Sequence, residues 1–528
     1  MKRPIFYLLL LLLSFNSHAQ DIYHQFYEAD QENSISAIHA VEGDGFVISG
    51  ERLFEGVVSR YFIAKLNAIG EVEWVQDYAA SNQKGLGSRL IAVSSGGYVL
   101  AGTSTVGGAI GKSVIIRVDE TGEVVWSKNH IAGGKSRVYG AIETADGGFA
   151  FSGRSNNGDI VYKLDADGNL SWYQSIRGND GDGGASTFPI GELIELENGD
   201  IMATGYTHNL EMANSNGGVY CLDADGNIKW ARFFGGSEDE HARRLTETID
   251  GNVVVLSNTK SFGVVTQGFL LTKFNPEGEL LWAKTYDTDE INHFDAIKED
   301  RDGNLILVGR RGPIALCNSP NSYGAILKLT AKGEVIWSRE VQGSYEFKEV
   351  EFSENGHYNI VGYHINEANV TEGVLINISP DGVGCSLEDG DNYTVTVRNP
   401  TISEEFETHS TVEIMDFFCA ANEIEFNEDT YCFEEYVSIA ENNLETGLIV
   451  YPIPSQINLN FKLKQNNELI QEVQIFDLKG QLVHKESDVN ANSLMINLSH
   501  LKSGQYMFQL TKSTNKASRT INGRFLLE

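Results

Sequence analysis

The chain has few cysteines, which cross-link small secreted proteins, and few of the basic residues that attract nucleic acids. It contains 5 cysteines and 9 prolines in 528 residues, and so few cysteines do not make a disulfide framework. Lysine and arginine number 40 against 73 aspartates and glutamates, which leaves a net charge of −33. This charge argues against nucleic acid as a partner, because phosphate would be repelled. It argues equally against docking on anionic lipid.

Long apolar runs are missing beyond the first residues. No later stretch reaches the roughly 18 apolar residues of a membrane span, so we expect no transmembrane helix. The N-terminus has a basic start at 1–3, an apolar run at 4–15, and small residues at Ser17 and Ala19. This pattern predicts a secretory signal peptide at 1–19 and a secreted or cell-surface protein.

Familiar catalytic signatures are also missing. The sequence has no Gly-x-Ser-x-Gly, His-Glu-x-x-His, P-loop or Cys-x-x-Cys motif, the patterns that mark several large enzyme classes. The Asp-x-Asp-Gly turns at 165–168 and 223–226 are similar to half of a calcium loop. Equivalent turns at other places lack the carboxylates, which favours simple hairpin turns.

Glycine is abundant, with 54 residues, and it recurs in a motif with tryptophan. Each of the 6 tryptophans follows a glycine by four residues, and the period of roughly 50 residues is typical of propeller blades. The tryptophans are Trp74, Trp126, Trp172, Trp230, Trp282 and Trp337. We interpret them as structural residues that fill the wedge between blades. A sugar-binding platform is the alternative interpretation.

A second glycine-containing turn occurs in every unit. These turns lie at 43–46, 95–98, 146–149, 198–201, 250–253, 302–305 and 355–358, and their Asx-Gly or Gly-Gly pairs suit tight hairpins. Counting back five residues from each turn gives an apolar column: Ile38, Leu90, Ala141, Leu193, Leu245, Ile297 and Val350. An innermost strand packed between blades needs such a column. We therefore predict that each unit forms four antiparallel strands, which is the number of strands in one propeller blade.

The seventh unit lacks its tryptophan, and the N-terminus supplies a substitute. Residues 22–27 are similar to 72–78, with Tyr23 near the position of Trp74. We predict that 21–30 form the outer strand of the seventh blade and close the ring. The propeller would then span 20–385, with six or eight blades as the alternatives.

The segment 386–446 has a different composition, because no lysine or arginine occurs from 399 to 461. We interpret 386–446 as an acidic, β-containing linker, and Ca²⁺ is the cofactor that its carboxylates would suit. Cys385, Cys419 and Cys432 cluster around this segment. A disulfide between Cys385 and Cys419 is the favoured pairing, and an odd cysteine is left over.

The C-terminal residues 447–528 read as short strands of a small β-sandwich. They carry Val-Tyr-Pro-x-Pro at 450–454, Ile-Phe-Asp-x-x-Gly-x-x-Val at 475–483 and Leu-x-x-Leu-x-x-Gly-x-Tyr at 498–506. In this order the motifs resemble the type A sorting domain of the type IX secretion system of Bacteroidetes-type bacteria, although Ile453 stands where that family usually has Asn. The resemblance implies export through the periplasm and across the outer membrane, with the type IX machinery as the partner of 447–528. The repeats resemble, more loosely, those of secreted bacterial β-propellers of unknown ligand.

Together these patterns predict an all-β chain, a seven-bladed β-propeller followed by a small immunoglobulin-like β-sandwich. Candidate ligand-binding residues stand nine positions before the glycine turns, where the inner strands begin near the central funnel. They are Arg137, His241, His293 and Glu346. The last three fall on adjacent blades and have the chemistry of a metal site, with polar residues at a wet channel mouth as the other interpretation.

For function, we expect a non-catalytic propeller that binds a glycan or a protein. A secreted hydrolase or lyase with its site in the funnel is the alternative. It is disfavoured because no pair of carboxylates repeats or converges in the sequence. A stalk or adhesin without a small-molecule site is a further possibility.

Overall fold

The computed structural model is described from residue 20 to residue 527 with short gaps. The gaps are 29–31, 42–44, 55–57, 80–83, 107–108, 132–135, 156–157, 178–186, 189–190, 210–213, 265–266, 289, 313–321, 367, 386, 390–393, 399–400, 404–406, 410–412, 417–419, 424–426, 437–447, 454–457, 464–468, 478–481, 499, 502–503 and 514–517. The predicted signal peptide at 1–19 and Cys419 lie outside the described residues. Every regular element in the described ranges is a β-strand, which confirms the all-β prediction. The same ranges contain no helix long and apolar enough to cross a membrane.

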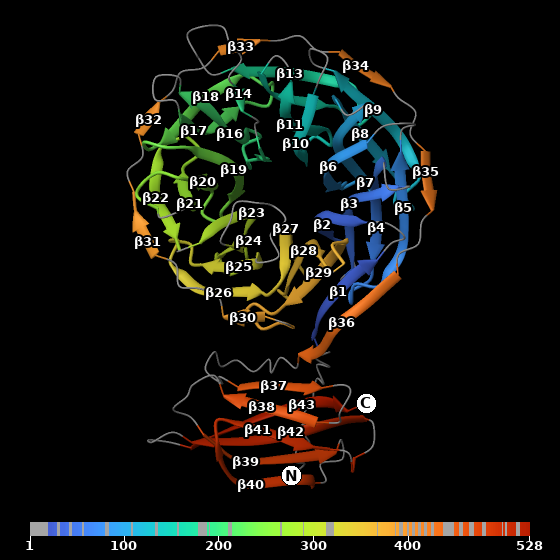
Figure 1. Cartoon of the computed structure of the whole chain (residues 1–528), viewed down its shortest axis with the longest axis vertical. Coiled ribbons are helices and arrows are strands. Elements are labelled where there is room, and N and C mark those ends of the chain that lie inside the picture. Colours follow the sequence, from blue (N-terminus) through green and yellow to red (C-terminus); the bar gives the residue numbers. More distant parts are fainter. Residues whose placement is uncertain are drawn as a thin grey trace, which may run out of the picture. The chain divides into compact units, whose positions relative to one another are not determined.

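The propeller consists of antiparallel sheets arranged in a ring, as Figure 1 shows. Across the described part of Gln20–Tyr436 the strands form seven such sheets. Four of them contain β2 (Asn33–Ala40), β3 (Phe46–Phe54), β4 (Val58–Leu66) and β5 (Val72–Ala79); β6 (Lys84–Ala92), β7 (Tyr98–Val106), β8 (Ala109–Val118) and β9 (Val124–Ile131); β10 (Ser136–Glu143), β11 (Phe149–Ser155), β12 (Gly158–Leu164) and β13 (Leu170–Arg177); and β14 (Thr187–Phe188), β15 (Leu193–Glu195), β16 (Ile201–Asn209), β17 (Asn214–Leu222) and β18 (Ile228–Gly235).

The remaining three sheets follow the same plan, with the first strand nearest the centre of the ring. They contain β19 (Glu240–Glu247), β20 (Val253–Thr259), β21 (Gly268–Phe274) and β22 (Leu280–Asp287); β23 (Ile291–Glu299), β24 (Leu305–Gly312), β25 (Tyr323–Leu329) and β26 (Val335–Val341); and β27 (Ser344–Phe352), β28 (Tyr358–Ile365), β29 (Thr371–Ile378) and β1 (Gln20–Glu28). Of the predicted apolar column, Ala141 is half-buried and the other members are buried. This column supplies part of the apolar contact between neighbouring sheets.

The N-terminal strand β1 completes the sheet of β27, β28 and β29. It pairs antiparallel with β29, and Phe26 lies opposite Val374. The Tyr27 hydroxyl donates to the Gly70 carbonyl of the next sheet at 2.5 Å, just as Tyr78 donates to Gly122 at 2.8 Å. The strand from the start of the chain therefore makes the same contact to its neighbour as an ordinary fourth strand does.

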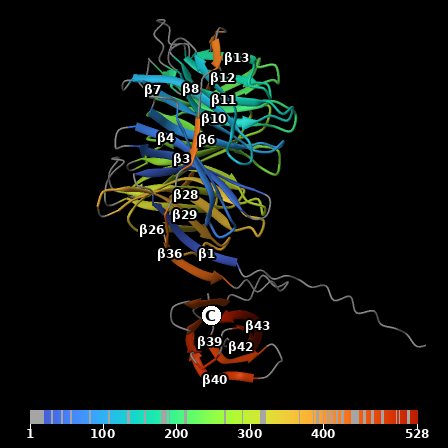
Figure 2. The same cartoon turned by 90° about the vertical axis from the view of Figure 1, so that its right-hand side faces the viewer.

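The segment 387–436, which we name the outer segment, does not run as a free linker. Each of its strands pairs antiparallel with the outermost strand of one sheet, and these strands lie on the rim of the ring in Figure 1. In chain order β30 (Leu387–Asp389), β31 (Thr394–Val397), β32 (Thr401–Ser403), β33 (Glu407–His409), β34 (Glu413–Asp416), β35 (Ala420–Glu423) and β36 (Asn427–Tyr436) pair with β26, β22, β18, β13, β9, β5 and β1. Along the chain, the outer segment therefore visits the sheets in the reverse of the order in which they are formed. Figure 2 shows β36 beside β1.

The C-terminal residues form two antiparallel sheets around one core. The sheets are β37 (Leu448–Ile453), β38 (Asn458–Leu463) and β41 (Ser493–Asn497), and β40 (Leu482–Ala491), β39 (Leu469–Asp477), β42 (Gly504–Ser513) and β43 (Ser518–Leu527). Phe461 of the first sheet and Phe508 of the second meet edge to face, with ring centroids 5.0 Å apart. Leu459, Ile475 and Leu510 are buried in the same cluster, so this module has a core of its own.

The repeated tryptophans join each sheet to the following one. In four cases the indole nitrogen donates to a carbonyl in the turn that follows the third strand of the next sheet: Trp126 to Ala166 (3.2 Å), Trp172 to Ala224 (2.9 Å), Trp230 to Pro276 (3.0 Å) and Trp337 to Pro380 (3.3 Å). The rings lie against the glycine of that turn, where a Cβ on Gly226 would come within 2.6 Å of Trp172. All six indoles are half-buried, so they act as clamps at the rim of each interface and are not fully enclosed.

His24 is a buried titratable group at the place where the ring closes. It is 0% exposed and packs against Phe26 and Tyr345, with ring centroids 4.9 and 5.6 Å away. Burial, aided by the charge of His364, lowers the His24 pKa from 6.5 to about 4. The pKa of His364 is also lowered by burial, and the nearest carboxylate to that ring, Glu372, lies 3.8 Å from its Nδ1. Acid should therefore weaken the closing sheet.

We expect the Gly226→Ala variant to be less stable than a matched Gly199→Ala variant. Both glycines have positive φ, 84° and 81°, so alanine costs about 1–2 kcal/mol at either site. At Gly199 an added Cβ meets nothing within 4 Å, whereas at Gly226 it meets the Trp172 ring, which adds about 1–3 kcal/mol of overpacking. Thermal unfolding followed by tryptophan fluorescence measures both. Equal melting temperatures would contradict the clamp.

We expect the propeller to lose stability as the pH falls from about 6.5 to about 4. The folded pKa of His24 lies below its ordinary value, so the unfolded chain takes up a proton that the folded chain resists. The full difference is worth about 3 kcal/mol. The His24→Phe variant should flatten this acid limb in urea unfolding measured at each pH, while His500→Gln, which removes an exposed histidine, should keep it. An unchanged acid limb in His24→Phe would contradict the assignment.

Candidate functional site

The four predicted site residues lie on inner strands at one common register. Arg137, His241, His293 and Glu346 stand on β10, β19, β23 and β27. They face Arg154, Asn258, Arg310 and Tyr363 of the adjoining second strands. In every repeat the same number of residues separates this position from the glycine turn. Residues at equal spacing from the turn therefore lie at the same level along the inner strands.

Immediately after this register the inner strands are bulged. The pairing shifts between Ala242 and Arg244 on β19, and between Phe294 and Ala296 on β23. A bulge adds a residue that opposes no partner and re-aims side chains next to it. The added residues on these strands are Arg243 and Asp295, and both become part of the site. A bulge leaves no periodic trace in the sequence, so neither residue was predicted.

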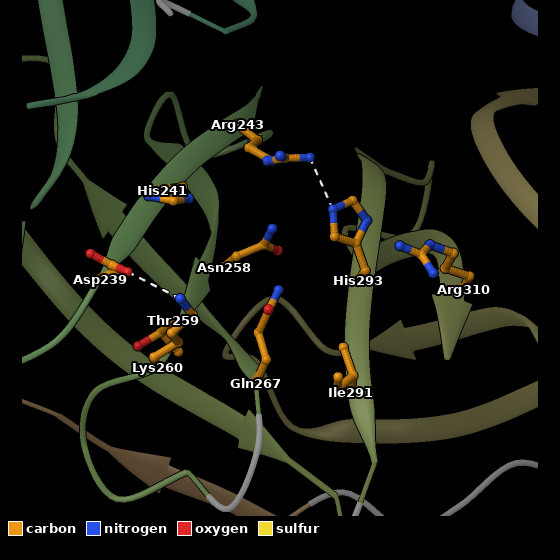
Figure 3. Close-up of a pocket in the computed structure, with 10 residues that line it drawn as sticks. All are labelled: Asp239, His241, Arg243, Asn258, Thr259, Lys260, Gln267, Ile291, His293 and Arg310. Carbon is orange, nitrogen blue, oxygen red and sulfur yellow. Dashed lines mark hydrogen bonds and ion pairs between the residues drawn. The ribbon is translucent and has the colours of Figure 1, made fainter. Parts of the chain in front are cut away.

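The structure brings His241 and His293 to opposite sides of one pocket, which we name the His241–His293 pocket (Figure 3). Its volume is about 270 Å³. The lining residues come from the sheets of β19–β22 and β23–β26, and they are Asp239, His241, Arg243, Asn258, Thr259, Lys260, Gln267, Ile291, His293 and Arg310. Arg137 and Glu346, the other two predicted residues, do not line it.

His241 is an uncharged ring in this pocket at neutral pH. It stacks on Tyr206, with ring centroids 4.1 Å apart and an interplanar angle of 30°. Burial and the nearby Arg243 guanidinium lower the His241 pKa to about 4. Burial also raises the pKa of Tyr206 to about 12. His241 therefore lines the pocket as a neutral ring that is stacked on Tyr206.

His293 is held between a cation and a carboxylate. Its Nε2 lies 2.9 Å from Nη1 of Arg243, so this ring nitrogen accepts a hydrogen bond because a guanidinium can only donate. Its Nδ1 lies 3.6 Å from Asp295. Although burial alone would raise the Asp295 pKa, the nearby Lys348 and His293 hold it well below its usual value. Asp295 is therefore a fixed negative charge behind the pocket wall.

Glu346 lies outside the pocket, behind its lining residue Arg310. Its carboxylate accepts from Tyr363 at 2.7 Å, lies 3.4 Å from Arg310 and pairs with Lys348. Two cations and a phenol thus occupy the oxygens that a metal would need. The described residues include no group of three or more His, Cys, Asp or Glu side chains that could hold a metal ion, so His241, His293 and Glu346 do not form the metal site that their spacing suggested.

Arg137 and the cysteines lie apart from the pocket. Arg137 contacts the Tyr139 hydroxyl on its own strand at 3.3 Å. Cys385 is buried and disulfide-bonded, and Cys221 is a buried free thiol. From residue 399 to residue 436, where Ca²⁺ was considered, the side chains are not among those described.

One polar atom in the pocket wall has no partner among the described residues. Asn258 is 7% exposed, and its Oδ1 is buried without a hydrogen bond there. Figure 3 shows the Asn258 side chain pointing between His241 and His293, with Gln267 below it. A buried amide oxygen in this position costs free energy unless a donor reaches it.

Comparison with known families gives matches in two regions. Residues 449–522 match the family described as "Secretion system C-terminal sorting domain". Residues 111–352 match the family described as "Outer membrane protein assembly factor BamB". No curated protein matches the chain.

Solved structures show a likeness of fold at low identity. The "Crystal structure of polysaccharide lyase Uly1" is 10% identical and covers 68% of this chain and 99% of its own, with a TM-score of 0.42. The β-propeller domain of the Trilobed protease from Pyrococcus furiosus is 11% identical, with coverages of 68% and 99% and a TM-score of 0.41. A protein of unknown function from Bacteroides caccae is 10% identical, with coverages of 61% and 94% and a TM-score of 0.35. At these values the likeness carries no argument about activity.

The match to the sorting-domain family indicates where the protein is located. Its match spans the C-terminal strands that carry the three motifs at 450–454, 475–483 and 498–506, so the predicted resemblance is confirmed. The chain therefore carries a secretion system C-terminal sorting domain behind a β-propeller region, and this domain indicates type IX secretion to the cell surface or the extracellular space.

Proposed function

We propose that this protein is a secreted, non-catalytic binding protein that holds a glycan or a protein in the His241–His293 pocket. The observation that carries the proposal is the pocket itself, with aromatic, amide and cationic groups converging from two neighbouring sheets. Ligand sites commonly combine such a concave shape with a small number of oriented polar groups.

The carboxylates near the pocket support binding over acid–base catalysis. A general acid needs a carboxyl with a raised pKa. Burial would raise the Asp239 pKa, but its ion pair with Lys260, 3.1 Å away, lowers it. The pKa of Asp295 is held well below its usual value. Both groups therefore stay ionised and cannot donate a proton at neutral pH.

A hydrolase or lyase remains the second candidate, and one contact favours the lyase. Tyr206 stacks on His241 beside Arg243. A neutral imidazole can accept a proton, a phenol with a raised pKa can donate one, and a guanidinium can stabilise a developing anion. Two neutral groups and a cation are enough for proton abstraction next to a carboxylate.

We also propose the finer architecture. The sheets correspond to a propeller of seven blades over 20–385, closed by the N-terminal strand, and the C-terminal module at 447–528 to an immunoglobulin-like sandwich. Supporting this, β1 lies beside β29, and two sheets share the C-terminal core. Cleavage of the proposed signal peptide at 1–19 would make Gln20, the first residue of β1, the mature N-terminus.

We expect Cys385 to pair with Cys419, as the sequence predicts. Cys385 is disulfide-bonded, and it stands directly before the outer segment. A peptide map of the protein without reduction should yield one linked pair containing both cysteines, which disappears on reduction. A map that links Cys385 to Cys317 or Cys432 would contradict the pairing.

We expect a screen of full-length protein against glycans and secreted proteins to find a ligand whose affinity falls about tenfold in His241→Ala. Loss of the ring removes the stacked surface with Tyr206, and tenfold corresponds to about 1.4 kcal/mol. The matched control is Lys332→Gln, an exposed turn residue that does not line the pocket. No ligand, or one that binds His241→Ala normally, would contradict this use of the pocket.

The same samples separate binding from catalysis. Glycans incubated with the protein and followed by ultraviolet absorbance and chromatography should remain intact. A new double bond that appears with wild type and not with Tyr206→Phe would establish the lyase instead.

A further inference from the structure

We propose that the His241–His293 pocket binds a carboxylated sugar, such as a uronic acid unit of an acidic glycan. This inference rests on the proposed binding function and names its ligand class. It is carried by three properties of the pocket: the exposed cationic head groups in its wall, an unsatisfied buried acceptor, and its size.

Three cations line the pocket in a strongly acidic protein. They are Arg243, Lys260 and Arg310, against the single carboxylate Asp239 among the described lining residues, while the whole chain carries −33. Each cation has a carboxylate near it: Asp239 lies 3.1 Å from Lys260, Glu346 3.4 Å from Arg310 and Asp295 3.9 Å from Arg243. The side chains of Arg243 and Lys260 are still 43% and 51% exposed, so an anion in the pocket can contact both head groups directly.

The guanidinium of Arg243 suits a carboxylate in particular. Its Nη1 binds His293, and Asp295 lies 3.9 Å away, so both contacts fix the head group at the pocket wall. A guanidinium has five N–H donors in a planar fork, which can hold both oxygens of a carboxylate. His293 thus positions Arg243 and leaves donors for a ligand.

A carboxylate alone would leave Asn258 unsatisfied. The Oδ1 of this 7% exposed residue needs a donor, and an ionised carboxylate without hydroxyl groups provides none. The hydroxyl groups of a sugar ring do provide one. The same sugar can pack against the His241 ring, which lines the pocket and is stacked on Tyr206.

The volume fits one ring. About 270 Å³ lies just below the roughly 300–1,000 Å³ of pockets that enclose drug-sized ligands. One pyranose with its carboxylate fits such a space, whereas an extended peptide would need a groove across several strands. The pocket therefore favours a single sugar unit of a longer glycan that continues into solvent.

The test is calorimetric titration of the full-length protein with matched oligosaccharides. One series ends in glucuronic acid and the other in glucose, and inorganic phosphate and a glutamate-rich peptide are titrated separately. We expect the uronate series to bind at least tenfold tighter than the glucose series, with affinity falling as salt rises. Arg243→Gln and Lys260→Gln should each lose about tenfold, and Asn258→Leu should weaken the uronate series in the same way.

Lys332→Gln is the charge-matched control, because it removes an exposed cation outside the pocket, and it should bind as wild type does. Lys260→Gln serves if Arg243→Gln does not fold, since Lys260 is half exposed. Equal binding of the glucose and uronate series would overturn the inference and leave the binding function intact. Binding of phosphate or of the peptide in place of the uronate series would also overturn it. If neither sugar series nor any ligand in the wider screen binds, the inference and the proposed function fall together.

Discussion

The contact between each sheet and the next is the interaction on which this structure depends. A sheet in the ring has two apolar faces, and its neighbours cover both. These contacts are local and recur around the ring. An indole and a tyrosine or arginine from one sheet contact the turn after the third strand of the next sheet. The Tyr286 hydroxyl donates to the Gly333 carbonyl, and the Arg339 guanidinium donates to the Gly382 carbonyl. A ring built this way is stable only when the last interface also forms. Tyr27 from the N-terminal strand completes it, so both ends of the propeller region must come together.

Closure of the ring leaves the outer edge of every sheet unpaired, and the outer segment covers these edges. Its strands begin at residues 387, 394, 401, 407, 413, 420 and 427, so each step to the next sheet takes six or seven residues. An exposed strand edge is a template for aggregation, and a secreted protein cannot rely on intracellular chaperones to guard it. The circuit ends at β1, which is paired on one side by β29 and on the other by β36. The strand that closes the ring is thereby held from both sides.

Local chemistry explains what the sequence could predict. Turn glycines such as Gly226 need positive φ, Trp172 must lie against such a turn, and Leu245 must be buried. Each requirement recurs at a fixed spacing, so it is visible in the sequence. The sequence predicted β-structure in 386–446 but not that it pairs with the sheets, because most of these strands have only three or four residues and carry no repeating pattern. The sequence predicted only part of the pocket. The common register of His241 and His293 followed from their equal spacing before the glycine turns. Arg243 and Asp295 are bulge residues and Asn258 lies on the facing strand, so none of these three was predicted.

The repeats make the ring nearly regular, so a specific site must come from what differs between them. The positions equivalent to His241 include Ser34, Leu86 and Arg137, whereas at this junction His241 and His293 line one pocket from two neighbouring sheets. At this one junction Arg243 has two effects. It lowers the pKa of His241, together with burial, and it supplies a charge that does not titrate. The imidazole therefore stays neutral at neutral pH while the guanidinium keeps its charge. Anion binding there depends on fixed charges, and its strength should follow ionic strength and not neutral-range pH.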